Sequence, residues 1–342
     1  MSQKEITIYD IAEKLKISAA TVSRALQNHP AVNAKTKKRI VDLASELGYQ
    51  SNKFASNLRK QKTHTIGVIV PRLNSAFMST VLSGIEKVAN NAGYNLIISQ
   101  SFETQEKEAK NAQTMFNNRV DALIISLAYD TKDYKHLNSF IKKNIPIIFF
   151  DRVADEIDAT KVLIDNFKAG YQATEHLIHQ GCKEILHITG NLIRNVYNDR
   201  LNGYKKALDD NGIKYDQKLV ISNDLSEKAI EDCLKNDVLK RQKLPDGLFI
   251  TSDPSAAYAL TILKEAGVKV PEDMAIIGFN NDLISRVCEP AISTINYPGN
   301  QMGETIASIL INHLNGESDI NYMNTVILKT DLIVRNSSLK KE

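Results

Sequence analysis

This chain of 342 residues contains no tryptophan and only three cysteines. Cys182, Cys233 and Cys288 are too few and too scattered for a disulfide framework, so we expect a reducing compartment. No apolar run approaches the ~20 residues of a membrane-spanning helix, and the first residues do not resemble a signal peptide. The sequence therefore predicts a globular, cytoplasmic protein that has no membrane partner.

Motifs of common α/β enzymes are also missing. No two glycines form a G-x-G pair, and neither a phosphate-binding G-x-x-x-x-G-K nor a G-x-S-x-G nucleophile turn is present. His176, His179 and Cys182 are spaced three residues apart and could suggest a metal site, but no further histidine or cysteine nearby completes one. We therefore expect no catalytic residue, cofactor or metal, and a solvated helix face at these three positions.

Positive charge is concentrated near the N-terminus. Residues 1–63 contain 12 lysines and arginines against 5 acidic residues, whereas the rest of the chain contains 31 against 35. The formal net charge of +3 therefore combines a basic N-terminal part with a mildly acidic body. Such asymmetry is typical of a module that binds the phosphates of a nucleic acid.

Three short helices are predicted in a domain of residues 1–50. Thr7, with Asp10 three residues later, can form the capping box of the first helix, and Ser18 can cap the second after a very short turn. Asn33 can cap the third helix. Two helices joined by so tight a turn indicate a helix-turn-helix, whose second helix enters the major groove of DNA. The alternative is a three-helix bundle with a basic face that is merely solvated.

The start of the second helix carries residues suited to read DNA bases. Ala19 and Ala20 are small and apolar, which suits the methyl group of thymine, and Arg24 can pair bidentately with a guanine edge. Lysines at the start of the third helix suit phosphate contacts, which position a protein on DNA but do not select a sequence.

Three segments carry a resemblance to a known family: TIYDIAEKLKISAATVSRAL, KTKKRIVDLASELGY and SNKFASNLRKQKTHTIGVIVP. They resemble the lactose-repressor/galactose-repressor (LacI/GalR) family of bacterial transcription regulators, and the similarity continues to the C-terminus. The resemblance implies a repressor that binds a near-palindromic operator in double-stranded DNA as a homodimer. It also implies that a small carbohydrate-like effector, bound in a cleft between two lobes, controls operator affinity. The few residues after Arg335 are too short for a tetramerisation helix, so we expect a dimer.

Residues 51–64 form a polar, basic segment that is too short for a helix stable on its own. The resemblance implies a hinge helix that folds on DNA and inserts Leu58 into the minor groove, where an apolar wedge kinks the duplex. Ser51 and Phe54 depart from the family's usual proline and smaller aliphatic residue, which leaves a flexible tether as the alternative. Head and hinge together supply the expected DNA contacts, which are Thr7, Tyr9, Ser18, Ala19, Ala20, Thr21, Ser23, Arg24, Lys35, Thr36, Lys37, Tyr49, Asn52, Lys53 and Leu58.

From residue 65 onward, short apolar runs alternate with amphipathic helices. Strands are expected at residues 66–70, 94–99, 122–126, 146–150, 184–189, 247–251 and 274–279. Helices are expected between the first two strands and at residues 104–118, 167–180, 199–211 and 255–266. This alternation predicts the α/β class, with parallel sheets in two doubly wound lobes. The resemblance implies an effector-binding and dimerisation domain with the periplasmic-binding-protein type I fold, its lobes being about residues 65–162 plus 293–325 and about 163–292 plus 326–342.

Ligands of such folds bind beyond the carboxyl ends of the strands, where polar residues collect in this sequence. The expected effector contacts are Arg72, Asn74, Phe77, Asp151, Arg194, Arg200, Asp253 and Asn280. By resemblance, Arg200 corresponds to the family's cleft arginine in an R-x-x-G-Y pattern, whereas Asn280 replaces an acidic residue. Together with Arg72, Arg152 and Arg194, these features predict a cleft more cationic than a neutral sugar needs.

The effector class and the functional class each keep an alternative. Guanidinium groups pair bidentately with carboxylates and phosphates, so the cleft predicts a uronate or a sugar phosphate. The alternative is a neutral sugar, with Arg72 and Arg194 exposed or paired with Asp151 and Asp199. The alternative function is a sugar-cleft enzyme or binding protein with a basic N-terminal extension, for which Asp151 and Asp253 would be the carboxylate pair.

Overall fold

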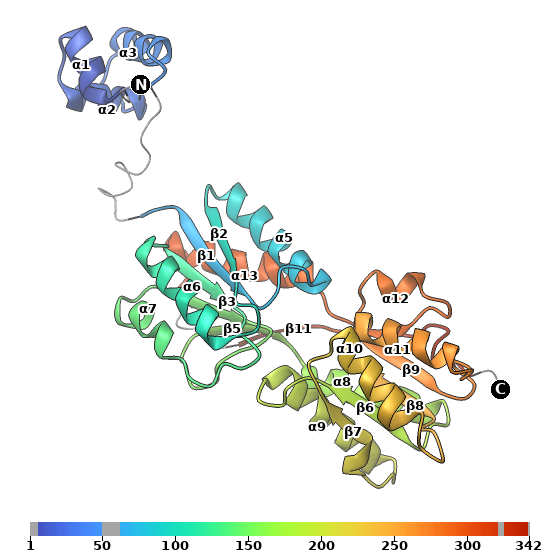
Figure 1. Ribbon diagram of the computed structural model, residues 1–342. Coiled ribbons are helices and arrows are strands. Elements are labelled where there is room, and N and C mark those ends of the chain that lie inside the picture. The colour runs from blue at the N-terminus through green and yellow to red at the C-terminus, as the bar shows by residue number, and fades with distance from the viewer. Residues whose placement is uncertain (1–5, 50–61, 321–324, 341–342) are drawn as a thin grey trace. The chain divides into compact units, whose positions relative to one another are not determined.

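A computed structural model describes residues 6–49, 62–320 and 325–340 of the chain. These residues fall into two compact units, a head within residues 1–63 and a body within residues 64–342 (Figure 1). Helices and strands alternate in the body, whereas the described part of the head is helical. None of the described helices is long and apolar enough to cross a membrane.

The head consists of three helices around a small apolar core. Helix α1 spans Ile8–Leu15, α2 spans Ala19–Leu26 and α3 spans Ala34–Glu46. The core is formed by Ile11, Ala12, Val22, Ala25, Ile40 and Ala44. Each helix therefore contributes one apolar face to the core and exposes its other face.

The helix caps predicted at Thr7, Ser18 and Asn33 are confirmed. The backbone N–H and the hydroxyl of Thr7 both donate to the carboxylate of Asp10, at 2.7 and 2.6 Å. The side chains of Ser18 and Asn33 accept the backbone N–H three residues later, at 3.1 and 2.8 Å. These bonds satisfy N–H groups at the start of each helix that would otherwise lack a partner.

The first lobe of the body is built on a parallel sheet with the strand order β11-β5-β4-β3-β1-β2. Its strands are β1 Thr65–Val70, β2 Asn95–Gln100, β3 Ala122–Ile125, β4 Ile147–Phe150, β5 Thr160–Ile164 and β11 Thr325–Leu328. Its helices are α5 Ala76–Asn91, α6 Gln105–Asn117, α7 Asn138–Lys142 and α13 Gly299–Leu314. In the sheet, Val68 of β1 lies between Ile98 of β2 and Ile124 of β3. The central strands are buried, as expected where helices cover both faces of a sheet.

The second lobe has a sheet with the strand order β12-β10-β9-β8-β6-β7. Its strands are β6 Ile185–Thr189, β7 Val220–Ser222, β8 Gly247–Ile250, β9 Ala275–Asn280, β10 Ser293–Asn296 and β12 Leu332–Ile333. Its helices are α8 Asn166–His179, α9 Asn195–Asp210, α10 Glu227–Cys233, α11 Asp253–Glu265 and α12 Ile284–Val287. Strand β12 is antiparallel to β10, and the other pairs are parallel.

Glycines allow the helices of each lobe to pack closely. A Cβ atom at Gly170 of α8 would lie 2.3 Å from the carbonyl oxygen of Arg200 in α9. In the first lobe, a Cβ atom at Gly303 of α13 would lie 2.0 Å from the carbonyl oxygen of Val81 in α5. Both distances are too short for any side chain, so the α8–α9 contact fixes the backbone from which Arg200 projects.

The seven predicted strands and the predicted helices of the body are present, but three expectations need correction. Residues 293–296 pair with β9 and belong to the second lobe, whereas 325–328 pair with β5 and belong to the first. Helix α9 begins at Asn195, so Arg200 lies in its second turn and does not open it. Strands β5, β7, β10, β11 and β12 are not among the seven predicted strands, and β7 and β12, with three and two residues, are too short to show a strand pattern.

Candidate DNA-binding face and effector cleft

The outer face of α2 carries two of the residues predicted to read DNA bases. Val22 and Ala25 point into the head core, with 0% and 2% of their surface exposed. Ala20 and Arg24 are exposed and four residues apart, which places them on one outward face. This face therefore presents an arginine and a small apolar side chain, the two groups suited to guanine and thymine edges.

Other residues predicted at the start of α2 are engaged within the head. Ala19 packs against the apolar core and is only partly exposed. The hydroxyl groups of Ser18 and Thr21 lie 2.8 Å apart, which ties both side chains to the helix cap. Ser23 is partly exposed.

The residues predicted to contact phosphates lie at the starts of α1 and α3. Thr7 is exposed, and 71% of the surface of Tyr9 is accessible. Lys35 is exposed, whereas the ammonium group of Lys37 donates to the side chain of Asn28.

The remaining predicted DNA contacts are less open or not described. Thr36 is partly exposed on α3, and Tyr49 packs partly against the head core. Asn52, Lys53 and Leu58 lie outside the described residues.

In the body, hydrogen bonds between the lobes bring the carboxyl ends of the two sheets face to face. The hydroxyl of Tyr129, after β3, donates to the carbonyl of Asn223, after β7, at 2.7 Å. Asn191, after β6, donates to the carbonyl of Tyr129 at 3.1 Å, and Asn195 donates to the carbonyl of Asp151, after β4, at 3.0 Å. The segments that follow the strands therefore meet between the lobes, where the sequence predicts a ligand cleft.

Asp151 is buried in this region. Its carboxylate accepts a hydrogen bond from the hydroxyl of Tyr297 at 2.9 Å and a longer one from Ser126 at 3.4 Å. Burial raises the pKa of Asp151, although the positive charges of Arg152 and Arg200 oppose this shift. A carboxyl group in such surroundings holds its proton more readily than an exposed one.

Two aromatic rings from different lobes stack beside Asp151. The ring centroids of Phe77, on α5, and Tyr297, after β10, lie 4.1 Å apart, and Phe279 meets Tyr297 edge-on at 6.1 Å. Burial raises the pKa of Tyr297 well above its ordinary value, so its hydroxyl remains a donor toward Asp151. The stack provides an aromatic wall that joins the two lobes.

Arg200 is buried and held from several sides. Its Nε donates to the side-chain oxygen of Asn166 at 2.9 Å, and Nη1 donates to the carbonyl of Thr251 at 3.4 Å. The guanidinium carbon lies 3.5 Å from the ring centroid of Phe279, a cation–π contact. Burial lowers the pKa of Arg200. These contacts hold the guanidinium plane in one orientation.

Glu103, which the sequence analysis did not single out, pairs with two of the cleft arginines. Its carboxylate accepts Nη1 of Arg152 at 2.6 Å and lies 3.3 Å from Nε of Arg72. It also accepts the backbone N–H of Tyr129 at 3.0 Å. The side chain of Arg72 is 48% exposed, so Arg72 faces partly to solvent and is paired with Glu103 rather than with Asp151.

Arg194 caps α9 and is 2% exposed. Its Nη2 donates to the carbonyl of Thr131, in the first lobe, at 2.5 Å. Among the described residues, Nε and Nη1 of Arg194 have no hydrogen-bond partner. Burial lowers the pKa of Arg194, and Tyr134 and the buried carboxylate of Glu108 oppose this shift. Arg194 is therefore buried rather than exposed, and no ion pair with Asp199 is found in the described part of the chain.

Several buried polar groups between the lobes lack partners within the described structure. They are the hydroxyls of Ser101 and Thr189, Nε of Arg152, Nε and Nη1 of Arg194, and the amide nitrogen of Asn223. Each of these residues ends or follows a strand, or caps α9. Folded proteins rarely leave buried polar groups unpaired, so these groups are candidates to bind a ligand or ordered water.

The remaining predicted effector contacts differ in their surroundings. Asp253 is fully buried, and its carboxylate accepts the hydroxyl of Thr294 and the backbone N–H of Asp282, both at 2.8 Å. Asp253 therefore braces the turn that carries Asn280, whose side chain donates to Asp282 at 3.4 Å. Asn74, ahead of α5, is exposed.

The cleft contains residues that the sequence analysis missed, chiefly Glu103, Tyr129, Tyr197, Asn223 and Tyr297. All but Tyr197 follow a strand, which is the available signal, but β7 and β10 were not among the predicted strands, so Asn223 and Tyr297 were not recognised as lying at strand ends. The hydroxyl of Tyr197 accepts Nη2 of Arg152 at 3.1 Å, a contact between lobes that no sequence pattern reveals.

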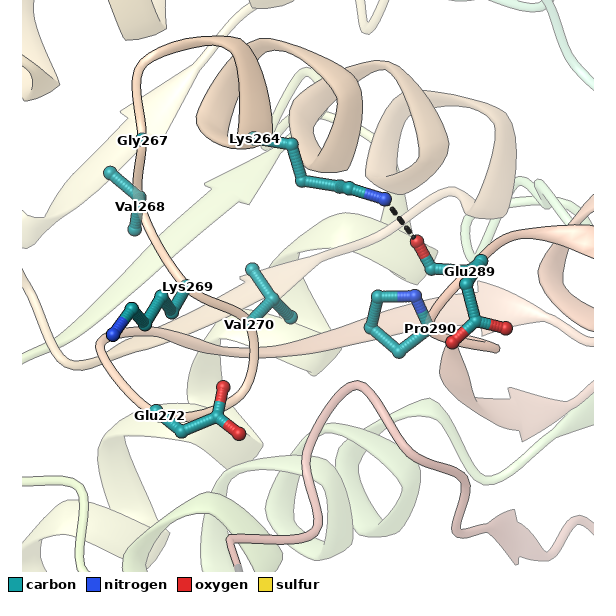
Figure 2. Close-up of a pocket in the computed structure, with 8 residues that line it drawn as sticks. All are labelled: Lys264, Gly267, Val268, Lys269, Val270, Glu272, Glu289 and Pro290. Atoms are coloured by element: carbon teal, nitrogen blue, oxygen red, sulfur yellow. Dashed lines mark hydrogen bonds between the residues drawn. The ribbon is translucent and has the colours of Figure 1, made fainter.

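A surface hollow lies away from this cleft (Figure 2). It is lined by the segment between α11 and β9 and by Glu289 and Pro290, and Lys264 donates to the carbonyl of Glu289 at 2.8 Å. The segment enters β9 at its amino end, whereas the cleft lies at the carboxyl ends of the strands. The hollow is therefore separate from the predicted effector site.

Two of the three residues considered for a metal site have other partners, and Cys182 is buried rather than on the expected solvated face. Nε2 of His176 lies 2.8 Å from the hydroxyl of Ser338, and the thiol of Cys182 lies 3.1 Å from the carbonyl of Asp246. Within the described ranges, no group of three or more histidine, cysteine or acidic residues could hold a metal ion.

Comparisons with known proteins agree with this architecture. Residues 7–52 match the model of the bacterial regulatory proteins of the lacI family, and residues 174–338 match a periplasmic binding protein-like domain. The chain is 32% identical over 337 residues to the HTH-type transcriptional regulator RegA of Clostridium saccharobutylicum, which covers 97% of this chain and 99% of that protein.

Two solved structures resemble the fold. One is a Lac repressor dimer bound to operator and an anti-inducer, with a TM-score of 0.83, 23% identity and coverage of 98% of this chain and 100% of that one. The other is a LacI-type regulator from Alkaliphilus metalliredigens complexed with D-xylulofuranose, with a TM-score of 0.67, 26% identity and coverage of 81% and 100%. With its helix-turn-helix head and two-lobed body, the chain belongs to the LacI family of bacterial transcription regulators.

Proposed function

We propose that this regulator acts as a homodimer and that its effector is an anionic carbohydrate, a uronate or a sugar phosphate. The observation that carries the effector class is the buried guanidinium group of Arg194, with two N–H groups unpaired in the described structure. A buried charge is unfavourable unless a partner of opposite charge meets it. The buried carboxylate of Glu108 offsets part of this charge, but its oxygens accept hydrogen bonds from Ala128 and Thr131. A carboxylate or phosphate oxygen of the effector would supply a directly bonded partner.

The hydrogen-bond donors at the cleft support the same class. Four arginines lie there, Arg72, Arg152, Arg194 and Arg200, and the carboxyl groups that interact with them are Glu103, Glu108, Asp151, Asp199 and Asp224. Burial raises the pKa of Asp151 and of Asp199, which weakens the negative charge set against the arginines. The unpaired amide nitrogen of Asn223 and Nε of Arg152 are further donors, so a ligand rich in acceptor oxygens is favoured.

The carbohydrate part of the proposal rests on the aromatic wall. Phe77 and Tyr297, which are 6% and 4% exposed, form a stacked apolar pair beside the hydrogen-bonding groups of Asp151 and Arg200. Binding sites commonly combine aromatic walls with a few placed polar groups. A relative of this fold is known as a complex with D-xylulofuranose, which agrees with a sugar-sized ligand.

Control of DNA binding follows from the contacts between the lobes. An effector that meets Arg194, Arg152 and Asn223 would favour one arrangement of the lobes, and coupling of this kind is typically ~1–3 kcal/mol. We propose that the arrangement of the lobes sets the spacing of two hinge segments, with Leu58 as the minor-groove wedge and with Ala20 and Arg24 at the bases. The protein would act in the cytoplasm, where bacterial DNA lies.

Calorimetry with matched ligands tests the effector class. Glucuronate and glucose 6-phosphate should bind more tightly than glucose, and galacturonate and galactose 6-phosphate should bind more tightly than galactose. Arg194→Gln keeps a polar, shorter side chain and removes the charge, and should cancel most of this advantage, about tenfold or more. Arg286→Gln, at an exposed position on α12, is the matched control and should change nothing.

The proposal fails if the neutral sugar of each pair binds more tightly than its acids and Arg194→Gln leaves that order unchanged. A gel-shift assay with palindromic DNA over a range of salt concentrations tests the DNA-binding part separately. Phosphate contacts require affinity to fall as salt rises.

A further inference from the structure

Glu103 occupies an unusual position at the edge of the cleft. It follows β2 and precedes α6, and both Phe102 and Glu103 have positive backbone φ angles, 51° and 64°. Two consecutive residues with side chains rarely adopt this conformation, which is disfavoured for residues other than glycine. The ring of Phe102 is 61% exposed, so packing of that ring does not explain the turn.

The contacts of Glu103 show what this turn achieves, because it brings the carboxylate to two arginines and a loop. Its Oε2 accepts Nη1 of Arg152 at 2.6 Å and the backbone N–H of Tyr129 at 3.0 Å, while Oε1 lies 3.3 Å from Nε of Arg72. One carboxylate thus joins two arginines and the loop after β3. That loop in turn contacts the second lobe, since the hydroxyl of Tyr129 donates to Asn223 at 2.7 Å.

We propose that Glu103 determines which charge the effector can carry, because it limits the cleft to a ligand with one negative charge. This inference rests on the proposed function. Glu103 neutralises part of the charge of Arg72 and Arg152 and leaves Arg194 as the buried arginine with two unpaired N–H groups in the described structure. A uronate carboxylate carries one negative charge and matches this arrangement. A phosphate monoester above its second pKa of ≈ 6 carries close to two, and its second charge meets the carboxylate of Glu103.

Repulsion between like charges is the physical reason why the cleft would discriminate against a dianionic ligand. Two negative groups in a partly buried cleft interact much more strongly than in water, because the local dielectric constant is lower. The side chain of Glu103 is 16% exposed, so solvent screens it only in part. Without the negative charge of Glu103, Arg72 and Arg152 would both become available to a dianion.

The experiment compares the same panel of sugar acids and sugar phosphates in the full-length protein and in Glu103→Gln. At pH 8, where the phosphates are dianions, the wild-type protein should prefer each uronate over the corresponding 6-phosphate. Glutamine keeps the shape of the side chain and an acceptor for the N–H of Tyr129. The substitution should shift the ratio of phosphate to uronate affinity toward phosphate by about tenfold or more.

Glu106→Gln is the matched control, because Glu106 lies three residues away on α6 and is exposed. It should leave the affinity ratio unchanged. If Glu103→Gln does not fold, Arg72→Gln tests the same charge balance by removing a positive charge, and it should shift the ratio of phosphate to uronate affinity toward uronate.

The outcomes separate this inference from the proposed function. If acids bind better than neutral sugars but Glu103→Gln leaves the ratio within about twofold of wild type, the role of Glu103 is refuted and the anionic effector stands. A wild-type protein that prefers phosphates also refutes it. If neutral sugars bind best, or no member of the panel binds, both proposals are overturned.

Discussion

Replacement of Asp253 by asparagine should make the body more stable at neutral pH and less sensitive to pH. Asp253 is fully buried, and burial raises its pKa to about 7. Its carboxylate accepts the hydroxyl of Thr294 and the N–H of Asp282, and a Cβ atom at Gly278 would lie only 2.1 Å from Oδ1. The side chain is therefore tightly enclosed, with no room for water to replace these partners.

The sign of the effect follows from the raised pKa. In the unfolded chain an aspartic acid ionises with a pKa of ≈ 3.9, so between about pH 4 and pH 7 the unfolded state loses its proton while the folded state keeps it. The stabilising contribution of the Asp253 carboxyl group is therefore fully present below about pH 4 and is lost as the pH rises to about 7. A difference of about three pKa units corresponds to ~4 kcal/mol at 1.36 kcal/mol per unit.

Asparagine can keep both contacts, because its oxygen can accept the N–H of Asp282 while its amide group donates to the hydroxyl of Thr294. Asparagine cannot ionise, so the free energy of unfolding of Asp253→Asn should exceed that of the wild type by up to ~4 kcal/mol at pH 8 and by little at pH 4. For a body of this size, that is a difference in Tm of ~10 °C.

Thermal unfolding of both proteins between pH 4 and pH 8 measures this difference. Asp232→Asn, at an exposed position on α10, controls for the loss of one carboxylate and should follow wild type. If the Tm difference between Asp253→Asn and wild type stays constant over this range, Asp253 does not ionise as its burial requires, and the reasoning is refuted.

Two further predictions concern the reading of bases and the packing of the cleft helices. Arg24→Ala should relax base preference and reduce the favourable free energy of operator binding by ~1–3 kcal/mol, whereas Lys37→Ala should weaken binding to all DNA sequences alike. If binding-site selection with Arg24→Ala returns the wild-type consensus at full strength, the role of Arg24 is contradicted. Gly170→Ala places a methyl group 2.3 Å from the carbonyl oxygen of Arg200, so it should lower the free energy of unfolding by ~1–3 kcal/mol or more and weaken effector binding. An unchanged Tm would show that α8 and α9 can move apart without strain.

The head was predictable because its signals are local. Caps at Thr7, Ser18 and Asn33 lie within three residues of the groups they bind, and a short turn between two amphipathic helices leaves few arrangements. The sequence did not show how far each predicted DNA contact is exposed: Ala19 packs partly against the core, whereas Ala20 is exposed. Exposure depends on the neighbouring helices, which the pattern of a single helix does not contain.

Hydrophobic periodicity acts over a few residues, so it is enough to predict the α/β class, seven of the strands and the polar residues that follow them. The partners of those polar residues depend instead on the tertiary fold. Glu103 pairs with Arg152, 49 positions away, and Tyr297 donates to Asp151, 146 positions away. Such pairs depend on how two sheets face each other across the cleft, and strand order and lobe packing, rather than local pattern, bring them within hydrogen-bonding distance.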